Sequence, residues 1–101
     1  MIKGLIQSFT FELPVGVGGE ISNAIVVFAQ NNANVLVKEL DDMVIQNDLL
    51  SVTLTQEETG KLALGTLQMQ IQIETNSNRQ YASEILQTIV YGTLGGVVIG
   101  Q

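Results

Sequence analysis

Residues 51–74 read SVTLTQEETGKLALGTLQMQIQIE, and the second half of this stretch decides the predicted fold. There, apolar and polar side chains alternate without interruption, with Leu67, Met69, Ile71 and Ile73 set against Gln68, Gln70, Gln72 and Glu74. A period of two is typical of a strand that turns one face toward a core. The stretch therefore predicts a strand over residues 66–75 with a row of glutamines on its other face.

The first half of the stretch predicts a strand that runs into one helical turn. Residues 50–54 alternate in the same way, and Thr55 then stands three positions before Glu58. That spacing is typical of a capping box, in which each side chain accepts a hydrogen bond from the backbone amide of the other residue. Because Gly60 disfavours a longer helix, we expect one short helical turn between Thr55 and Lys61.

The remaining segments read as further strands joined by short turns. Strands are predicted over residues 5–13, 24–30, 35–40, 43–46 and 80–90. Between them lie a glycine-rich loop at residues 14–20, which we expect to be flexible, and turns whose Asn residues tolerate positive φ. Short strands with tight turns are typical of an antiparallel β-sandwich. We therefore predict an all-β fold, with a sandwich domain over residues 1–91 and an apolar tail over residues 92–101.

The charge balance argues against several classes of partner. The 101-residue chain has 4 Lys and Arg against 10 Asp and Glu, which gives a net charge of −6. Its four cations are scattered, so we expect no basic patch for nucleic acid or for an anionic membrane surface. Charged residues make up only 14% of the chain, against about 25% in typical domains. This low fraction suggests that part of the surface lies against other chains.

The residue content also argues against catalysis and cofactor binding. The chain has no His and no Cys, so the commonest general base and the strongest nucleophile are missing. Glu57 and Glu58 are adjacent, and neighbours on a helical turn point apart, unlike the paired carboxylates of glycosidases. The glycines at positions 16, 18 and 19 do not complete a dinucleotide-binding fingerprint. We expect a protein that is not an enzyme and has no cofactor.

A group of acidic residues raises the question of a calcium site. Four carboxylates fall within ten residues, those of Glu39, Asp41, Asp42 and Asp48, and calcium prefers oxygen ligands. Their spacing matches no EF-hand loop, which also needs a glycine at its sharp turn. Acidic residues at two turns are typical of solvated turn formers. We therefore expect no metal site here.

The glutamine row, formed by Gln68, Gln70 and Gln72, is the first candidate for contact with other proteins. It is either an ordinary solvent-facing surface or a surface that hydrogen-bonds across a subunit contact without the desolvation of a charge. The low charge of the whole chain favours the contact surface.

The tail is the second candidate, because it carries the apolar side chains of Leu94, Val97, Val98 and Ile99. These residues either pack on their own sandwich as an edge segment or dock on a neighbouring molecule, where they would add a strand to an exposed edge. A glycine pair at residues 95–96 has the conformational freedom for either arrangement. Both alternatives remain open from the sequence.

Several segments together resemble a family of small structural proteins of phages and prophages from Gram-positive bacteria. The segments that carry the resemblance are SFTFELP at residues 8–14, VFAQN at 27–31, KELDD at 38–42, VTLTQEET at 52–59, AS at 82–83 and GVVI at 96–99. VTLTQEET is the most specific of these, and together they span nearly the whole chain. The layout is similar to that of the amino-terminal domain of phage baseplate upper proteins.

This resemblance implies an immunoglobulin-like sandwich in a virion, made in the cytoplasm of the host bacterium and without catalytic residues. Its partners would be other virion proteins and copies of itself, either as a homo-oligomer or within the assembled particle. We expect a module of the tail or baseplate. A capsid decoration protein, auxiliary to the phage head, is the alternative.

A carbohydrate-binding module on the phage surface is the contrasting hypothesis. Sugar rings stack on exposed aromatic faces, and this chain has no Trp, three Phe and two Tyr. The three Phe lie at strand positions that we predict to face inward. Only Tyr81 and Tyr91 could therefore stack on a sugar.

Overall fold

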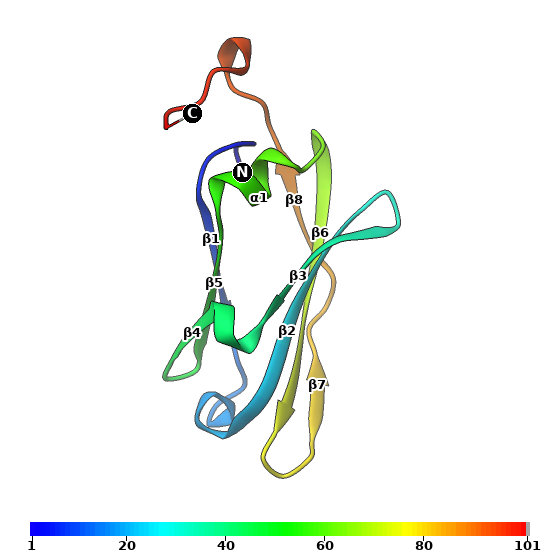
Figure 1. Ribbon diagram of the computed structural model, residues 1–101. Helices are drawn as coiled ribbons and strands as arrows, with labels where there is room; N and C mark the ends of the chain where they lie inside the picture. The colour runs from blue at the N-terminus through cyan, green and yellow to red at the C-terminus, as the bar shows by residue number, and fades with distance from the viewer. Residues whose placement is uncertain (101) are drawn as a thin grey trace.

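Two antiparallel sheets form the body of the protein, as a computed structural model that describes residues 1–100 shows (Figure 1). The smaller sheet has the strand order β1 (Gln7–Glu12), β5 (Leu49–Leu54) and β4 (Met43–Gln46). The larger sheet runs β3 (Ala33–Glu39), β2 (Ile21–Gln30), β6 (Gly65–Thr75), with β7 (Gln80–Ala82) and β8 (Leu86–Val90) both paired to β6. The predicted all-β character and the two antiparallel sheets are confirmed.

The core lies between the two sheets and is built from both. The four alternating apolar side chains of β6 are at most 5% exposed, so the predicted inward face of this strand is confirmed. They pack in one cluster with buried residues of β2 and β5. The rings of Phe9 on β1 and Phe28 on β2 lie 5.9 Å apart between their centroids and join the two layers directly. Burial of such large side chains removes apolar surface from water and holds the layers together.

The predicted helical turn is confirmed as α1 (Gln56–Gly60), which lies at one end of the sandwich between the sheets (Figure 1). Its capping box is complete, because the Thr55 amide donates to Glu58 Oε1 at 2.9 Å and the Glu58 amide donates to Thr55 Oγ1 at 3.2 Å. The hydroxyl of the buried Thr59 donates to the Leu5 carbonyl at 2.9 Å. The helix is thereby fixed to the segment that leads into β1.

Asparagine makes the tight turns, as predicted. Asn31 and Asn32, between β2 and β3, have φ values of 52° and 62°. Positive φ at both central residues defines the hairpin turn whose twist matches that of the flanking strands. Asn47 and Asn78 have φ values of 55° and 61° in the turns between β4 and β5 and between β6 and β7. The short polar side chain of Asn makes this left-handed conformation accessible.

The loop at residues 14–20, which we expected to be flexible, makes several contacts with the rest of the domain. It contains a 3₁₀ turn, Val17–Glu20, in which Val17 is buried against the core. The Asp48 carboxylate accepts hydrogen bonds from the amides of Gly16 and Gly18, both at 3.1 Å. One carboxylate therefore holds the loop against the turn between β4 and β5. The sequence indicated that glycine makes this loop flexible, but it did not indicate that Asp48 would bind the loop amides.

The prediction of one strand over residues 80–90 is wrong, because the chain leaves the ladder at residues 83–85. The Ser83 hydroxyl accepts a hydrogen bond from the Ile71 amide at 3.0 Å, in place of a strand carbonyl. On the far side of this break the register has moved by one residue: Gln72 pairs with Ala82, but Met69 pairs with Leu86. The extra residue separates β7 from β8.

The first residues of the chain join the larger sheet before β1 joins the smaller one. Ile2 forms a parallel bridge with Tyr91, just after β8. The Tyr91 amide donates to the Met1 carbonyl at 2.9 Å, and the Lys3 amide donates to the Tyr91 carbonyl at 2.8 Å. The predicted strand over residues 5–13 is shorter in the structure, where β1 begins at Gln7. The amino-terminal segment therefore closes one end of the sandwich.

Candidate interaction surfaces

The glutamine row lies on the outer face of the larger sheet, opposite the core-facing side chains of β6. Gln72 is exposed, whereas Gln68 and Gln70 are half-buried. The Gln70 side-chain amide donates to the Ser83 carbonyl at 2.9 Å, across the break between β7 and β8. Gln70 thus has a structural role at this break. The side chain of Gln72, by contrast, is open to solvent.

Uncharged side chains flank the glutamine row on the neighbouring strands. Ile25 and Val27 of β2 lie directly opposite Gln72 and Gln70. Beyond them, Val37 of β3 lies opposite Val27 and is 45% exposed. The part of this outer face around Val27 therefore mixes amide and aliphatic groups without a formal charge, and Glu39, opposite Ile25, lies at its border. Such a surface can be covered by another protein without the cost of removing a charge from water.

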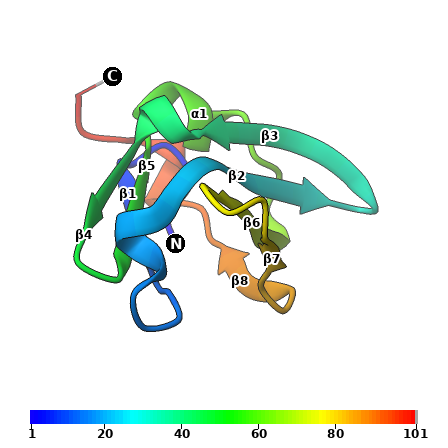
Figure 2. The same cartoon turned by 90° about the horizontal axis from the view of Figure 1, so that it is seen from below.

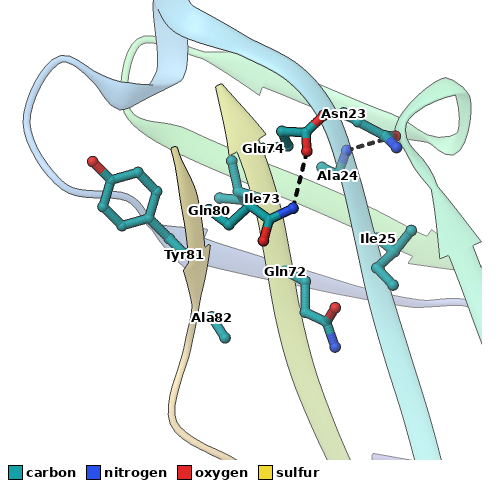
Figure 3. A pocket seen from close by; sticks show the side chains of 9 residues that line it. All are labelled: Asn23, Ala24, Ile25, Gln72, Ile73, Glu74, Gln80, Tyr81 and Ala82. Atoms are coloured by element: carbon teal, nitrogen blue, oxygen red, sulfur yellow. Dashed lines mark hydrogen bonds between the residues drawn. The ribbon is translucent and has the colours of Figure 1, made fainter. Parts of the chain in front are cut away.

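An open depression of about 350 Å³ lies at the β7 end of the same sheet (Figure 3). It is lined by Asn23, Ala24, Ile25, Gln72, Ile73, Glu74, Gln80, Tyr81 and Ala82. The Gln80 amide donates to Glu74 Oε2 at 3.0 Å, so these two polar groups are already paired. Tyr81 pairs with the core-facing Ile73. Figure 3 shows its ring on one side of β7 and the Gln80 side chain on the other, so the polar and aromatic groups do not converge.

A second depression, of about 460 Å³, lies between β3 and α1, and half of its eight lining residues are charged and form two ion pairs. Lys38 Nζ lies 2.7 Å from Glu58 Oε1, and the two side chains are only 10% and 24% exposed. Burial by itself raises the pKa of Glu58. The hydrogen bond and charge of Lys38 and the hydrogen bonds from Thr55 outweigh this effect, so the pKa lies below its usual value of 4.5. Glu58 is therefore a charged group that ties β3 to α1.

The two adjacent glutamates point to different partners, as the sequence predicted. Glu57 Oε1 lies 3.2 Å from Lys61 Nζ in an exposed pair, while Glu58 turns to Lys38. Two carboxylates that diverge in this way cannot act together across one bond of a substrate.

The acidic residues near β4 are used by the backbone. Asp42 Oδ2 accepts from the Glu39 amide at 3.4 Å in the 3₁₀ turn Leu40–Asp42, and Asp48 accepts from two glycine amides. Within residues 1–100, no group of three or more acidic side chains is placed to hold a metal ion. These carboxylates act as local caps of turns.

Residues 92–100 of the tail fold back over the amino-terminal end of the body, where Figure 1 shows them above α1, and the last residue of the predicted tail lies outside the described residues. Val98 packs on Gly4, where an added Cβ would lie 2.9 Å from Val98 Cγ2. The Gln56 side-chain amide donates to the carbonyl of Ile99 at 2.6 Å and to that of Gly4 at 3.3 Å. The other three apolar side chains of the tail, Leu94, Val97 and Ile99, are between 77% and 97% exposed. The Val98 side chain and the Ile99 carbonyl thus attach to the body a segment whose other apolar side chains are exposed.

The sequence reasoning missed one further surface, the edge formed by β7 and β8. Its exposed apolar side chains are Tyr81, Ile85, Leu86, Ile89 and Tyr91. The sequence does carry a signal for it, because no residue from 85 to 101 is charged. Ile85 is exposed because it lies in the break where the register changes, which periodicity alone did not indicate.

No family model, no curated protein and no solved structure matches this chain. No helix in the described part of the chain is both long enough and apolar enough to cross a membrane.

Proposed function

We propose that this chain is a structural module of a phage virion, located in the tail or baseplate, where it binds other virion proteins and copies of itself. The resemblance of its sequence segments to phage structural proteins supports this function. The most specific of them, residues 52–59, forms the end of β5 and the capped start of α1. This segment therefore has a defined structural role at the junction of the two sheets.

The observation that carries the proposal is the distribution of charge. A chain with a net charge of −6 leaves the outer face of its larger sheet around Val27, Val37 and Gln70, and its last seventeen residues, 85–101, without any charged side chain. Charged groups keep proteins soluble and apart, whereas neutral surfaces can be buried without desolvating an ion. Large neutral areas on a small acidic body are what an assembly module needs.

The immunoglobulin-like layout remains part of the proposal at the level of two packed sheets. In the constant-type immunoglobulin arrangement, the second strand pairs with the first and the fifth. Here β2 pairs with β3 and β6 instead. The similarity that we propose with baseplate domains therefore concerns the two-layer architecture and the position of the VTLTQEET segment.

A capsid decoration protein is the alternative within the virion, because a small acidic domain also suits that position. Copy number separates the two: decoration proteins are present in hundreds of copies per particle and baseplate proteins in tens at most. A carbohydrate-binding module is supported less well. Tyr81 and the amides near it lie on opposite sides of β7, so the depression offers no aromatic platform beside polar groups.

Quantitative mass spectrometry of purified particles tests the proposed function. Particles are purified from cells that carry the phage or prophage encoding this chain, and its peptides are measured against those of the major capsid and tail-tube proteins. We expect copies in the tens per particle. Hundreds of copies would support capsid decoration instead, and absence from washed particles would contradict a virion protein of either kind.

A further inference from the structure

β8 forms the outer edge of the larger sheet over part of its length. Within residues 1–100, β8 pairs with β6 and with no other strand (Figure 2). The amide and carbonyl of Tyr91 both point to the amino-terminal segment, away from β6. Backbone groups alternate in direction along a strand. The amide and carbonyl of Gln87, and the amide of Ile89, therefore point outward from the sheet.

The amino-terminal segment covers this edge only at the carboxyl end of β8, from Ile89 to Tyr91. The Met1 amino group donates to the Ile89 carbonyl at 2.8 Å, and the bridge from Ile2 to Tyr91 lies just beyond. Below this point no described segment pairs with the outward groups of Gln87. Gln87 thus lies in the open part of the edge, and both of its backbone hydrogen-bonding groups are available to another strand.

The side chains along this open edge lack the features that keep sheet edges apart. Natural edge strands are protected by lysine, proline or inward-pointing charges. The opposite edge strand, β3, has such a charge, because Lys38 points inward and pairs with Glu58. β8 has no charged residue and no proline, and Ile85, Leu86 and Ile89 are between 40% and 62% exposed. The two edges of the larger sheet therefore differ in how well they are protected against pairing with a strand of another molecule.

We propose that a second copy of this chain pairs with the open β8 edge through its own β8 edge, in antiparallel orientation about a two-fold axis near Gln87. In an antiparallel pair, every second pair of opposite residues exchanges both backbone hydrogen bonds. A residue with a free amide and a free carbonyl is therefore complementary to itself across a two-fold axis. No other residue is needed to complete the contact.

The local charge of this edge is compatible with a second copy as the partner, although the net charge of the chain is not. Two molecules with a net charge of −6 repel each other, and their contact is least unfavourable where both surfaces are neutral. Glu84 is the only charged residue between positions 80 and 101. A basic partner would gain more from the acidic turns around Asp41 and Asp48. The dimer does not depend on the proposed place in a virion.

Sedimentation velocity of the full chain over a concentration series is the first measurement. The edge is short, and it buries less than the roughly 1,200 Å² of a stable interface, so we expect a dissociation constant on the order of 100 µM. Amide hydrogen exchange at low and high protein concentration then locates the contact. The Gln87 and Ile89 amides should exchange rapidly in the monomer and become protected together with dimer formation.

Two variants and a control test the geometry. With Gln87 on the axis, residue 89 lies opposite residue 85 of the second copy, so Ile89→Glu places a charge against an apolar side chain and should weaken dimerisation by about tenfold. Val44→Glu is the matched control, because Val44 is an exposed residue of the edge strand β4 and gives the same net charge. Gln87→Pro removes the outward amide without touching the ladder to β6, and it should also weaken the dimer about tenfold. Circular dichroism confirms that each variant is folded.

The outcomes of these measurements either support or overturn the proposed dimer. Dimerisation with protection of the Gln87 and Ile89 amides, lost in Ile89→Glu and kept in Val44→Glu, supports the edge-to-edge dimer. A chain that stays monomeric up to about 1 mM, or a dimer that leaves these two amides unprotected, overturns it. Equal weakening by Ile89→Glu and Val44→Glu would also overturn it, because net charge alone would then explain the effect. The copy number per particle, which tests the proposed function, is measured separately, so the dimer and the proposed function can fail independently.

Discussion

Glu58→Gln should destabilise the fold, because it removes the charge that pairs with the nearly buried Lys38. The glutamine keeps the shape and can still accept from the Thr55 amide, so the change isolates the ion pair. Loss of one partner costs about 3–5 kcal/mol in a fully buried pair and below about 1 kcal/mol in an exposed pair. Lys38 and Glu58 are 10% and 24% exposed, so we expect about 2 kcal/mol.

Urea unfolding at pH 7, followed by circular dichroism, measures this loss. A small domain has about 5–15 kcal/mol of stability, so the variant stays folded, and its midpoint should fall by roughly 1 M urea. Glu57→Gln is the matched control, because the neighbouring pair of Glu57 and Lys61 is exposed. The control should lie within about 0.5 kcal/mol of the natural protein.

The pH dependence gives the same pair a second signature. The pKa of Glu58 is lowered in the folded state, so the pair stabilises the fold at pH values above the unfolded-state pKa, near 4.5. That stabilisation is lost as the pH falls through the lowered folded-state pKa. The difference in unfolding free energy between the natural protein and Glu58→Gln should therefore shrink below pH 4.5.

A double variant completes the test of the pair. Lys38→Met combined with Glu58→Gln removes both charges and leaves an apolar side chain of similar length beside α1. Replacement of a buried pair by apolar groups is often neutral, so the double variant should regain most of the stability lost in Glu58→Gln. A Glu58→Gln variant as stable as Glu57→Gln, or a double variant less stable than Glu58→Gln, would refute the reasoning.

Three further changes test other parts of the structure. Ile71→Asp should unfold the domain, because it places an unpaired charge in the core. Gln72→Asp, on the opposite face of β6, should stay folded. Equal stability of the two variants in thermal denaturation would show that the inward and outward faces of β6 are assigned wrongly. Gly18→Ala should destabilise the fold by about 2 kcal/mol or more, because the added Cβ would overlap the backbone carbonyl oxygen of Asn47. Gly19→Ala has free space around the added Cβ and should be neutral. Similar melting temperatures for the two variants would contradict the packing of this loop. Deletion of residues 92–101 should keep the circular dichroism spectrum and lower the incorporation of the chain into particles; an unfolded product, or full incorporation, would contradict an assembly role for the tail.

The local features of the fold could be predicted because their causes lie close together in the sequence. The inward face of β6 follows from alternation, and the start of α1 follows from the three-residue spacing of Thr55 and Glu58. The positive φ values of Asn31 and Asn32 follow from the side chain of asparagine. Each of these needs only a few neighbouring residues.

The features that were missed depend on residues far apart in the chain. The break between β7 and β8 forms because the Ser83 hydroxyl takes the Ile71 amide, and nothing near Ser83 indicates that partner. The buried Lys38 is paired only because β3 lies beside α1 in the folded chain. The uncharged run at residues 85–101 could be read from the sequence, but which strand keeps an open edge depends on the whole sheet.

The central claim, that this chain is a structural module assembled into a phage tail or baseplate, is tested most directly by a density map of the intact particle. The account predicts a two-sheet body of this shape at the tail or baseplate, with the neutral outer face of its larger sheet or its tail segment covered by neighbouring proteins. A map in which every position of the particle is assigned to other chains would contradict it.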